Sequence, residues 1–250
     1  MIAVDIGNTY LHFFGFKNGE IFKSLRIPTL GVTKNKIKET LAKFLSGPVI
    51  VCSVVPGINH LFRGLKLKVY FVGSQIRVPI ICQYKKTEVG SDRLVAAFAA
   101  RTLFSQTRIV IDFGTAITFD FLSKNGHYQG GIILPGIGST LSVFSSCALL
   151  PNHIKLKKTN RMIPRNTQES ISKGLTEGFP AMINTLVKKY IKLLKISAEP
   201  TVVLTGGEAF GIKSALNFRY YYEPYLVAKG LYFLAAKYGF TEQPPTTPKN

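Results

Sequence analysis

The sequence predicts an α/β protein built from two related halves, each a mixed five-stranded sheet flanked by helices. The first observation is an apolar run, residues 1–4, that leads directly into Asp5 and Gly7. The second is a later copy, in which residues 109–111 lead into Asp112 and Gly114. Apolar runs without alternation, bounded by turn formers, are typical of buried strands. Two such strand–Asp-x-Gly hairpins indicate two halves that face each other and hold phosphates between them.

The composition predicts an ordered globular protein. The chain has 250 residues, 46% of them hydrophobic, and a mean hydropathy of +0.17, which suits one large or two small domains. Its cysteines, Cys52, Cys82 and Cys147, are odd in number and far apart, so we expect reduced thiols. No apolar run approaches a membrane span, and Asp5 interrupts any signal-peptide core. We therefore expect a soluble cytoplasmic protein with no membrane partner.

The charge is strongly basic. Lys and Arg number 32 against 13 acidic residues, a net charge of +19. Such an excess is compatible with nucleic acid, an anionic surface or phosphate-rich substrates, and equally with a basic surface of no function. The clearest basic cluster, residues 155–165, lies between Pro151 and Pro164 and is predicted to be a solvated loop. The charge alone therefore identifies no partner.

The first half has the element order of a ribonuclease-H-like domain. Its predicted strands are residues 1–5, 10–16, 21–27, 49–55 and 68–72. Asn18-Gly19 is a hairpin turn. Thr33 is predicted to cap a helix over residues 34–45, with Ile37, Leu41, Phe44 and Leu45 on one face. A ribonuclease-H-like domain has this order of elements: three antiparallel strands, and then parallel strands joined by helices.

An acid–base pair follows at the start of a helix. Residues 78–82 are a possible extra strand, and a helix is predicted over residues 94–104 with Ser91 as its N-cap. Asp92 in the first turn would complement the helix dipole, whereas Arg93 there is disfavoured by it. The pair is therefore not explained by helix chemistry, and it suits an anionic substrate that carries a hydroxyl group.

The second half repeats the order. Predicted strands are residues 107–112, 116–122, 128–134, 202–205 and 220–222. Predicted helices run from about residue 139 toward 149, over 167–194 with Thr167 as N-cap and a kink near 178–180, over 208–216 and over 226–238. The expected domains are residues 1–104 and 105–240, and residues 241–250 are expected to be a disordered tail.

Other motifs fail on inspection. The stretch 206–214 lacks a P-loop lysine because Ile212 stands in its place. The histidines show no metal-ligand spacing, and no nucleophile elbow is present. What remains has the parts that phosphoryl transfer needs: carboxylates, backbone and hydroxyl donors, and a base.

Together these parts resemble a type III pantothenate kinase, a member of the acetate and sugar kinase/Hsp70/actin superfamily. The motifs, in order, are residues 5–9, 90–93, 112–116, 130–131 with 135–136, 166–167 and 205–207. The resemblance covers the chain up to its tail. It implies two ribonuclease-H-like (actin-like ATPase) domains and ATP-dependent phosphorylation of pantothenate, the first step of coenzyme A biosynthesis.

The resemblance also implies roles for residues. Asp92 would be the general base that deprotonates pantothenate. The phosphate loop would be Asp5, Ile6, Gly7, Asn8, Thr9, Tyr10, Leu11 and His12, and Asp5 would orient hydrated Mg²⁺. Thr115, Gly206 and Gly207 would contact ATP, and Asp112 would bind K⁺ or NH₄⁺. Tyr84, Gly90, Ser91, Asp92 and Arg93 would bind pantothenate with Thr167 of a second subunit, which implies a homodimer.

The sequence departs from the family pattern at two places. His12 stands where members often carry lysine, and Tyr84 lacks the Asn-Pro pair that usually follows this tyrosine. Two alternatives stay open. One is a degenerate kinase fold that acts as a nucleic-acid-binding or regulatory protein, which the charge favours and the intact Asp5, Asp92 and Asp112 oppose. The other is a different small-molecule kinase or phosphatase of the same superfamily.

Overall fold

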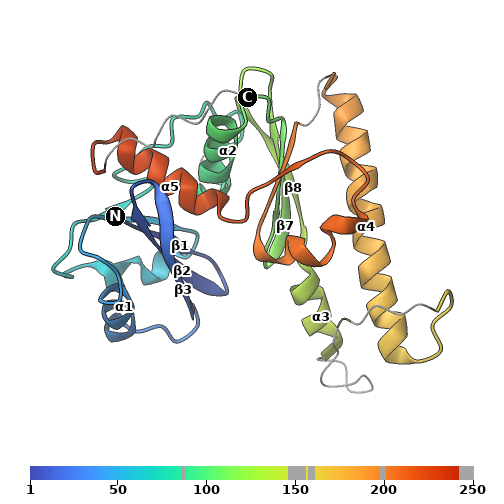
Figure 1. Cartoon of the computed structure of the whole chain (residues 1–250), viewed down its shortest axis with the longest axis horizontal. Helices are drawn as coiled ribbons and strands as arrows, with labels where there is room; N and C mark the ends of the chain where they lie inside the picture. Colours follow the sequence, from blue (N-terminus) through green and yellow to red (C-terminus); the bar gives the residue numbers. More distant parts are fainter. Residues whose placement is uncertain (86–87, 146–155, 157–160, 198–200, 242–250) are drawn as a thin grey trace. The chain divides into compact units, whose positions relative to one another are not determined.

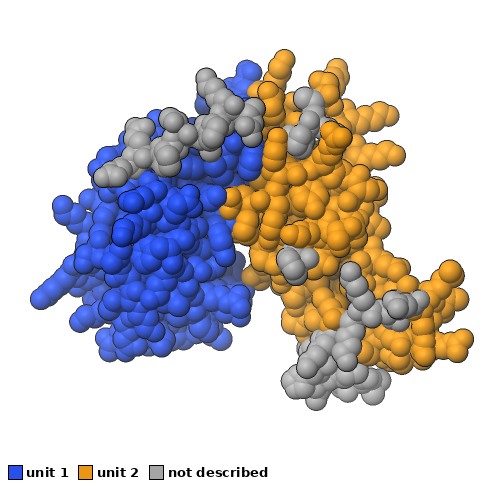
Figure 2. Space-filling model, viewed as in Figure 1, with its two compact units in different colours: residues 1–105, 125–130, 225–250 blue, residues 106–124, 131–224 orange. Residues whose placement is uncertain are grey.

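The computed structural model describes residues 1–85, 88–145, 156, 161–197 and 201–241 (Figure 1). The chain divides into two compact units (Figure 2). The first unit is Met1–Ser105, Asn125–Gly130 and Tyr225–Asn250, and the second is Gln106–Lys124 and Gly131–Pro224. The expected domain limits stay a prediction. Each unit has one five-stranded sheet flanked by helices, which confirms the predicted ribonuclease-H-like pair.

The sheet of the first unit has the order β3-β2-β1-β4-β5. Its strands are β1 (Ile2–Ile6), β2 (Tyr10–Lys17), β3 (Glu20–Pro28), β4 (Val49–Ser53) and β5 (Val69–Phe71). The first three are antiparallel, and β4 and β5 add in parallel. The helices of this unit are α1 (Lys34–Leu41), the 3₁₀ helix η1 (Pro56–Phe62), α2 (Ser91–Leu103) and α5 (Leu226–Lys237).

Helix α1 is shorter than predicted. Thr33 caps it as expected, because its hydroxyl accepts the Lys36 N–H at 3.2 Å. The helix ends at Leu41, since the next turn tightens into bonds that span three residues. Leu45, which we expected on the buried face, is therefore turned outward and 56% exposed.

Two further expectations in the first unit are wrong. Residues 78–82 form no strand, because Pro79 has no N–H to donate, and Cys82 makes only an isolated bridge with Tyr128. The strand predicted over residues 49–55 ends at Ser53 and gives way to η1.

Helices α2 and α5 pack on each other through small residues. A Cβ on Gly230 of α5 would lie 2.6 Å from Val95 Cγ1 of α2, and the α2 alanines facing this side are buried. Because small side chains line this contact, α2 and α5 approach each other closely.

The sheet of the second unit has the order β10-β9-β6-β7-β8. Its strands are β6 (Ile109–Phe113), β7 (Ala116–Leu122), β8 (Tyr128–Pro135), β9 (Val202–Thr205) and β10 (Tyr221–Tyr222). Its helices are α3 (Ile137–Ser145), α4 (Thr167–Leu193) and the 3₁₀ turns η2 (Gly207–Gly211) and η3 (Lys213–Ala215). Helix α4 runs unbroken through Pro180, and its buried face covers a core centred on β6, β7 and β9.

The helix predicted over residues 208–216 is instead the pair η2 and η3, since Gly207 and Gly211 disfavour a regular helix. The expected continuation of α3 to residue 149, Cys147, His153 and the tail from residue 242 lie outside the described residues. Within the described ranges, no helix combines the length and apolarity needed to cross a lipid bilayer.

Candidate functional site

The β1–β2 hairpin forms a fixed loop whose tip is open. Gly7 N–H donates to Tyr10 O at 3.0 Å, and Thr29 binds the same loop from the end of β3. The Thr29 hydroxyl donates to Gly7 O at 2.7 Å, and its N–H donates to Thr9 O at 2.9 Å. The side chains of Asn8 and Thr9 are exposed at the tip. The loop is thus held by its backbone and presents small polar groups to a ligand.

A row of four side chains crosses the sheet at the base of this loop. Arg26, His12, Asp5 and Cys52 are Cα partners on β3, β2, β1 and β4. Residues directly opposite each other on neighbouring strands point to the same face. The row therefore places Asp5 between a histidine and a thiol, on the face that α2 covers.

His12 is uncharged at neutral pH. Burial, and to a smaller extent the guanidinium of Arg26, lowers the pKa of His12 from 6.5 to about 4. The ring lies 4.0 Å from that of Phe14, centroid to centroid. His12 consequently cannot supply the positive charge that a lysine would bring to this loop.

The N-cap of α2 is Gly90, not Ser91 as predicted. The Ser91 hydroxyl is occupied elsewhere, because it lies 3.2 Å from Cys52 Sγ and donates to Ser53 O at 3.2 Å. Ser91 therefore joins the start of α2 to the end of β4. A Cβ on Gly90 would collide with the Asp92 carboxylate, so glycine is required there for Asp92 to take its position.

Cys52 on β4 lies between the strand of Asp5 and the start of the helix that carries Asp92. Burial raises the pKa of the Asp92 carboxyl, although the Arg93 N–H, which donates to Oδ1 at 2.8 Å, and the Arg93 guanidinium both lower it. Burial and the charges of Asp5 and Asp92 raise the pKa of the Cys52 thiol. Asp5 is the Cα partner of Cys52, and the hydroxyl of Ser91, the residue before Asp92, lies 3.2 Å from Cys52 Sγ. Strand β1 and the 90–93 loop therefore meet at Cys52, whose role no sequence motif indicates.

Tyr84 and Arg93 lie in one aromatic cluster. Arg93 is 8% exposed, with its guanidinium carbon 5.9 Å from the centroid of the Tyr128 ring. Tyr84 packs edge-on against Tyr128, and a Cβ on Gly130 would lie 3.2 Å from its ring. The structure therefore brings Tyr84 to the same side of the first unit as the Gly90–Arg93 loop.

A groove of about 1050 Å³ borders this loop in the first unit. Gly90 and Ser91 form one wall, and Asn59, Arg63 and Gln75 are among the polar residues of the others. Gly90 and Ser91 are accordingly open to this groove, whereas Asp92 and Arg93 are not among the residues that line it.

In the second unit, Asp112 and Gly206 are in close contact. Asp112 is the Cα partner of Thr205 on β9, and Gly206 follows directly with φ of +88°. A Cβ at Gly206 would collide with Asp112 Oδ1 and with Phe113 O. Two oxygen atoms therefore converge on a position that only glycine fits.

Thr115 and Gly207 belong to turns that are tied to α3. Thr115 O accepts the Gly136 N–H at 2.9 Å and the Ser139 hydroxyl at 2.6 Å. Glu208, which follows Gly207, accepts the Ile137 N–H at 3.0 Å at the start of α3. The negative charge of Glu208 at the N-terminus of α3 is favourable because the helix dipole is positive there. The sequence offered no signal for Ser139 or Glu208.

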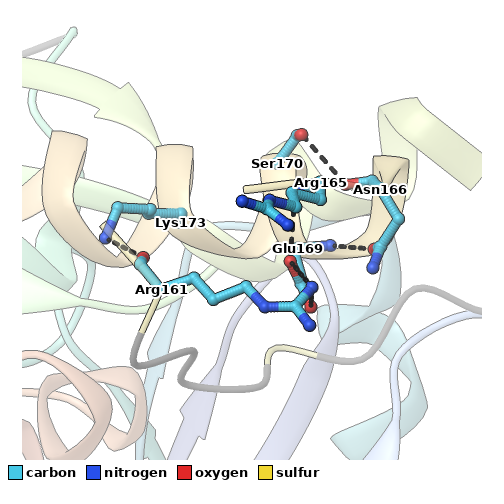
Figure 3. A network of polar contacts seen from close by, with 6 residues as sticks. All are labelled: Arg161, Arg165, Asn166, Glu169, Ser170 and Lys173. Atoms are coloured by element: carbon cyan, nitrogen blue, oxygen red, sulfur yellow. Dashed lines mark hydrogen bonds and ion pairs between the residues drawn. The ribbon is translucent and has the colours of Figure 1, made fainter. Parts of the chain in front are cut away.

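The N-cap of α4 is Asn166, not Thr167 as predicted (Figure 3). Asn166 Oδ1 accepts the Glu169 N–H at 2.8 Å, which leaves the Thr167 side chain exposed in the first turn. Hydrogen bonds from the Arg165 N–H and the Arg161 guanidinium hold Glu169, and both lower its pKa, the Arg165 N–H more strongly. The segment before α4 is thereby fastened to the helix.

The predicted site residues therefore form separate groups. One, in the first unit, holds residues 5–12, Tyr84 and residues 90–93, and a second, in the other unit, pairs Asp112 with Gly206 and ties Thr115 and Gly207 to α3. Thr167 lies apart at the start of α4. Among the described residues, no three His, Cys, Asp or Glu side chains are grouped as a metal site would need.

Comparison with known proteins identifies a family. The model of the family described as type III pantothenate kinase matches residues 1–189. A type III pantothenate kinase from a Sulfurihydrogenibium species is 32% identical over 251 residues, covering 94% of this chain and 98% of that protein.

Two solved structures are similar in fold. One, described as a Baf family transcriptional activator from Campylobacter jejuni, has a TM-score of 0.62 at 22% identity, covering 96% of this chain and 99% of that one. The other is an activator of 2-hydroxyisocaproyl-CoA dehydratase from Clostridium difficile with bound ADPNP. Its TM-score is 0.54 at 17% identity, and the match covers 99% of this chain and 100% of that one. Likeness at this level shows the fold alone.

Proposed function

Because this chain belongs to the type III pantothenate kinase family, we propose that it transfers the γ-phosphoryl group of ATP to the primary hydroxyl of pantothenate. The observation that carries the proposal is that Cys52 is the Cα partner of Asp5 and lies 3.2 Å, through its Sγ, from the hydroxyl of Ser91. The strand that leads into residues 5–12 and the 90–93 loop therefore meet in one unit. Phosphoryl transfer requires such a meeting of donor and acceptor sites.

Asp92 is the general base of the proposed reaction. Its carboxylate takes the proton of the pantothenate hydroxyl as that oxygen bonds to the γ-phosphorus and the bond to the β-phosphate oxygen of ATP breaks, which releases ADP. Burial raises the pKa of Asp92, and a higher pKa makes the carboxylate a stronger base. Gly90, Ser91, Arg93 and Tyr84 bind and orient pantothenate.

Residues 5–12 bind the phosphates of ATP. Thr29 holds the backbone of this loop in a fixed conformation, so its donors need little rearrangement when the triphosphate binds. Thr115, Gly206 and Gly207 contact the nucleotide from the second unit. Gly206 lets Asp112 and the Phe113 carbonyl approach its backbone, and a Cβ on Gly207 would meet open space, which suits a ligand at that residue.

The residues present fit two cations. Mg²⁺ is held in proteins by one or two carboxylates, water and substrate phosphates, and Asp5 beside the phosphate loop suits this role through water. Mg²⁺ would neutralise charge on the phosphates. K⁺ or NH₄⁺ would lie at Asp112, where the Phe113 carbonyl adds a second oxygen.

The proposed active form is a homodimer in the cytoplasm. Thr167 is exposed at the start of α4, where it can reach the pantothenate site of a second subunit. Just before it, Met162 and Ile163 are 88% and 75% exposed, and exposed apolar groups of this kind mark protein interfaces. ATP as a substrate and the free thiols Cys52 and Cys82 suit the cytoplasm.

The test is ATP-dependent phosphorylation of pantothenate with saturating Mg²⁺, in the presence and absence of K⁺. We expect K⁺-dependent turnover by the parent and a loss of about 10²–10⁴-fold in kcat for Asp92→Asn. Glu39→Gln, which removes an exposed carboxylate of the same unit, is the matched control and should retain full activity. If the parent does not turn over, the kinase proposal is wrong.

A further inference from the structure

The phosphate loop lies beside an arginine that no sequence motif assigns to it. Arg26 is the Cα partner of His12 across β2 and β3, and His12 is in turn the partner of Asp5. All three side chains consequently point to the same face of the sheet. Arg26 is exposed, and its charge acts on His12, so the guanidinium lies near the base of the loop.

Tyr10 and Thr29 hold Arg26 in position relative to the loop. The guanidinium carbon lies 5.0 Å from the centroid of the Tyr10 ring, within the range of a cation–π contact. Three residues after Arg26, Thr29 donates its two hydrogen bonds to the loop backbone. The side chain of Arg26 therefore contacts the loop at Tyr10, and the strand that carries Arg26 is hydrogen-bonded to the loop through Thr29.

The other end of this face is already covered. Tyr225 and Tyr232 pack against Phe14 and Phe16 of β2, with ring centroids 5.5 and 4.9 Å apart. Within the first unit, the end that holds Tyr10 and Arg26 is left exposed instead. An arginine can stack on an aromatic ring and still donate its N–H groups to an anion, and Arg26 at this exposed end is placed to do both.

We propose that Arg26 binds the terminal phosphates of ATP. This inference rests on the proposed function, since it takes residues 5–12 as the site of the triphosphate. The planar guanidinium donates several N–H groups at once, which suits phosphate oxygens. Arg26 is thus a substrate-binding residue supplied by β3, outside the loop itself.

The test is the affinity for ATP and for AMP, measured by calorimetry with Mg²⁺ present. Arg26→Ala should weaken ATP binding by about tenfold or more, the usual worth of a charge-assisted hydrogen bond, and leave AMP binding unchanged. Arg26→Lys keeps the charge without the planar donor group, so its ATP affinity should lie between those of the parent and Arg26→Ala.

Lys23→Ala is the matched control. Lys23 is on the same strand but points to the opposite face, where its Nζ donates to Lys43 O at 2.9 Å. Its removal should leave ATP affinity at the parental value. If Arg26→Ala binds ATP as tightly as Lys23→Ala does, or weakens ATP and AMP equally, Arg26 does not bind the terminal phosphates. If the parent itself binds no ATP, the proposed function fails together with this inference.

Discussion

Asp92 is held in surroundings that disfavour its charged form. Burial raises the pKa of its carboxyl above the ordinary value of 3.8, and the opposing contacts of Arg93 do not reverse the shift. In the unfolded chain the same group ionises freely. The folded state therefore binds the proton more tightly than the unfolded state, and stability falls as the pH rises above about 3.8 through the folded pKa.

Replacing Asp92 by asparagine should stabilise the fold at neutral pH. Asparagine cannot ionise, and its side-chain oxygen can still accept the Arg93 N–H. We expect Asp92→Asn to melt at a higher temperature than the parent at pH 7, with the difference vanishing below the unfolded pKa of 3.8. Thermal melts from pH 3 to 8 measure this, with Glu39→Gln as the exposed control. Equal melting temperatures at pH 7 would contradict a raised pKa.

At the scale of elements, a β-bulge decides which side chains join the phosphate loop. The β2–β3 register shifts between Gly15 and Phe16, so that His12 faces Arg26 instead of Leu25. A shift of one residue exchanges the two faces of a strand. Gly15 makes the bulge possible, because the rings of Phe22 and Phe44 occupy the place of its side chain.

Gly15→Ala should therefore destabilise the first unit. The added methyl group would lie within 3 Å of both rings, so we expect the free energy of unfolding to fall by about 1–3 kcal/mol. ATP affinity should fall as well, because Arg26 depends on the bulge for its register. Denaturant titration and calorimetry measure the two effects. Gly57→Ala, whose methyl group would meet open space, is the control and should be near neutral.

At the scale of the whole molecule, the proposed dimer depends on exposed apolar groups near Thr167. Ile163→Glu should convert the parent dimer into a monomer with the 27.6 kDa mass of one chain, and reduce kcat/KM for pantothenate. The physical reason is that a buried, unpaired carboxylate strongly disfavours an interface. Light scattering coupled to size exclusion gives the mass.

Leu30→Glu is the control for this substitution. Leu30 is at least as exposed as Ile163 but lies between β3 and α1, outside the interface proposed around Thr167, so its replacement should leave the dimer intact. A parent chain that is monomeric at assay concentrations would refute the dimer, and an Ile163→Glu variant that stays dimeric would place the interface elsewhere.

Much of the fold follows from local pattern. The two apolar runs ending in Asp5 and Asp112 predict the central strands β1 and β6, because a run without alternation suits a strand buried on both faces. The Asn18-Gly19 turn predicts the β2–β3 hairpin. The family resemblance rests on these same motifs and on Asp92-Arg93 in the first turn of α2.

The N-caps of α2 and α4 could not be predicted from local sequence alone. Asn166 and Thr167 can both serve as caps by residue type, and so can Gly90 and Ser91. Tertiary contacts decide between the members of the second pair: Ser91 is drawn to Cys52 and Ser53 on β4, so the cap is Gly90 and the helix begins at Ser91 instead of the expected residue 94.

The sequence by itself determined the type of fold, the family and the acidic residues around which we propose a phosphoryl-transfer site. These depend on hydrophobic period and on short motifs, both of which are local. Only the tertiary structure decided that Cys52 joins the strand of Asp5 to the 90–93 loop, that Thr29 holds the loop of residues 5–12 and that Arg26 is paired with His12 beside it. Each of these depends on strand register and on contacts between residues far apart in the chain, and a single bulge is enough to change which side chains meet.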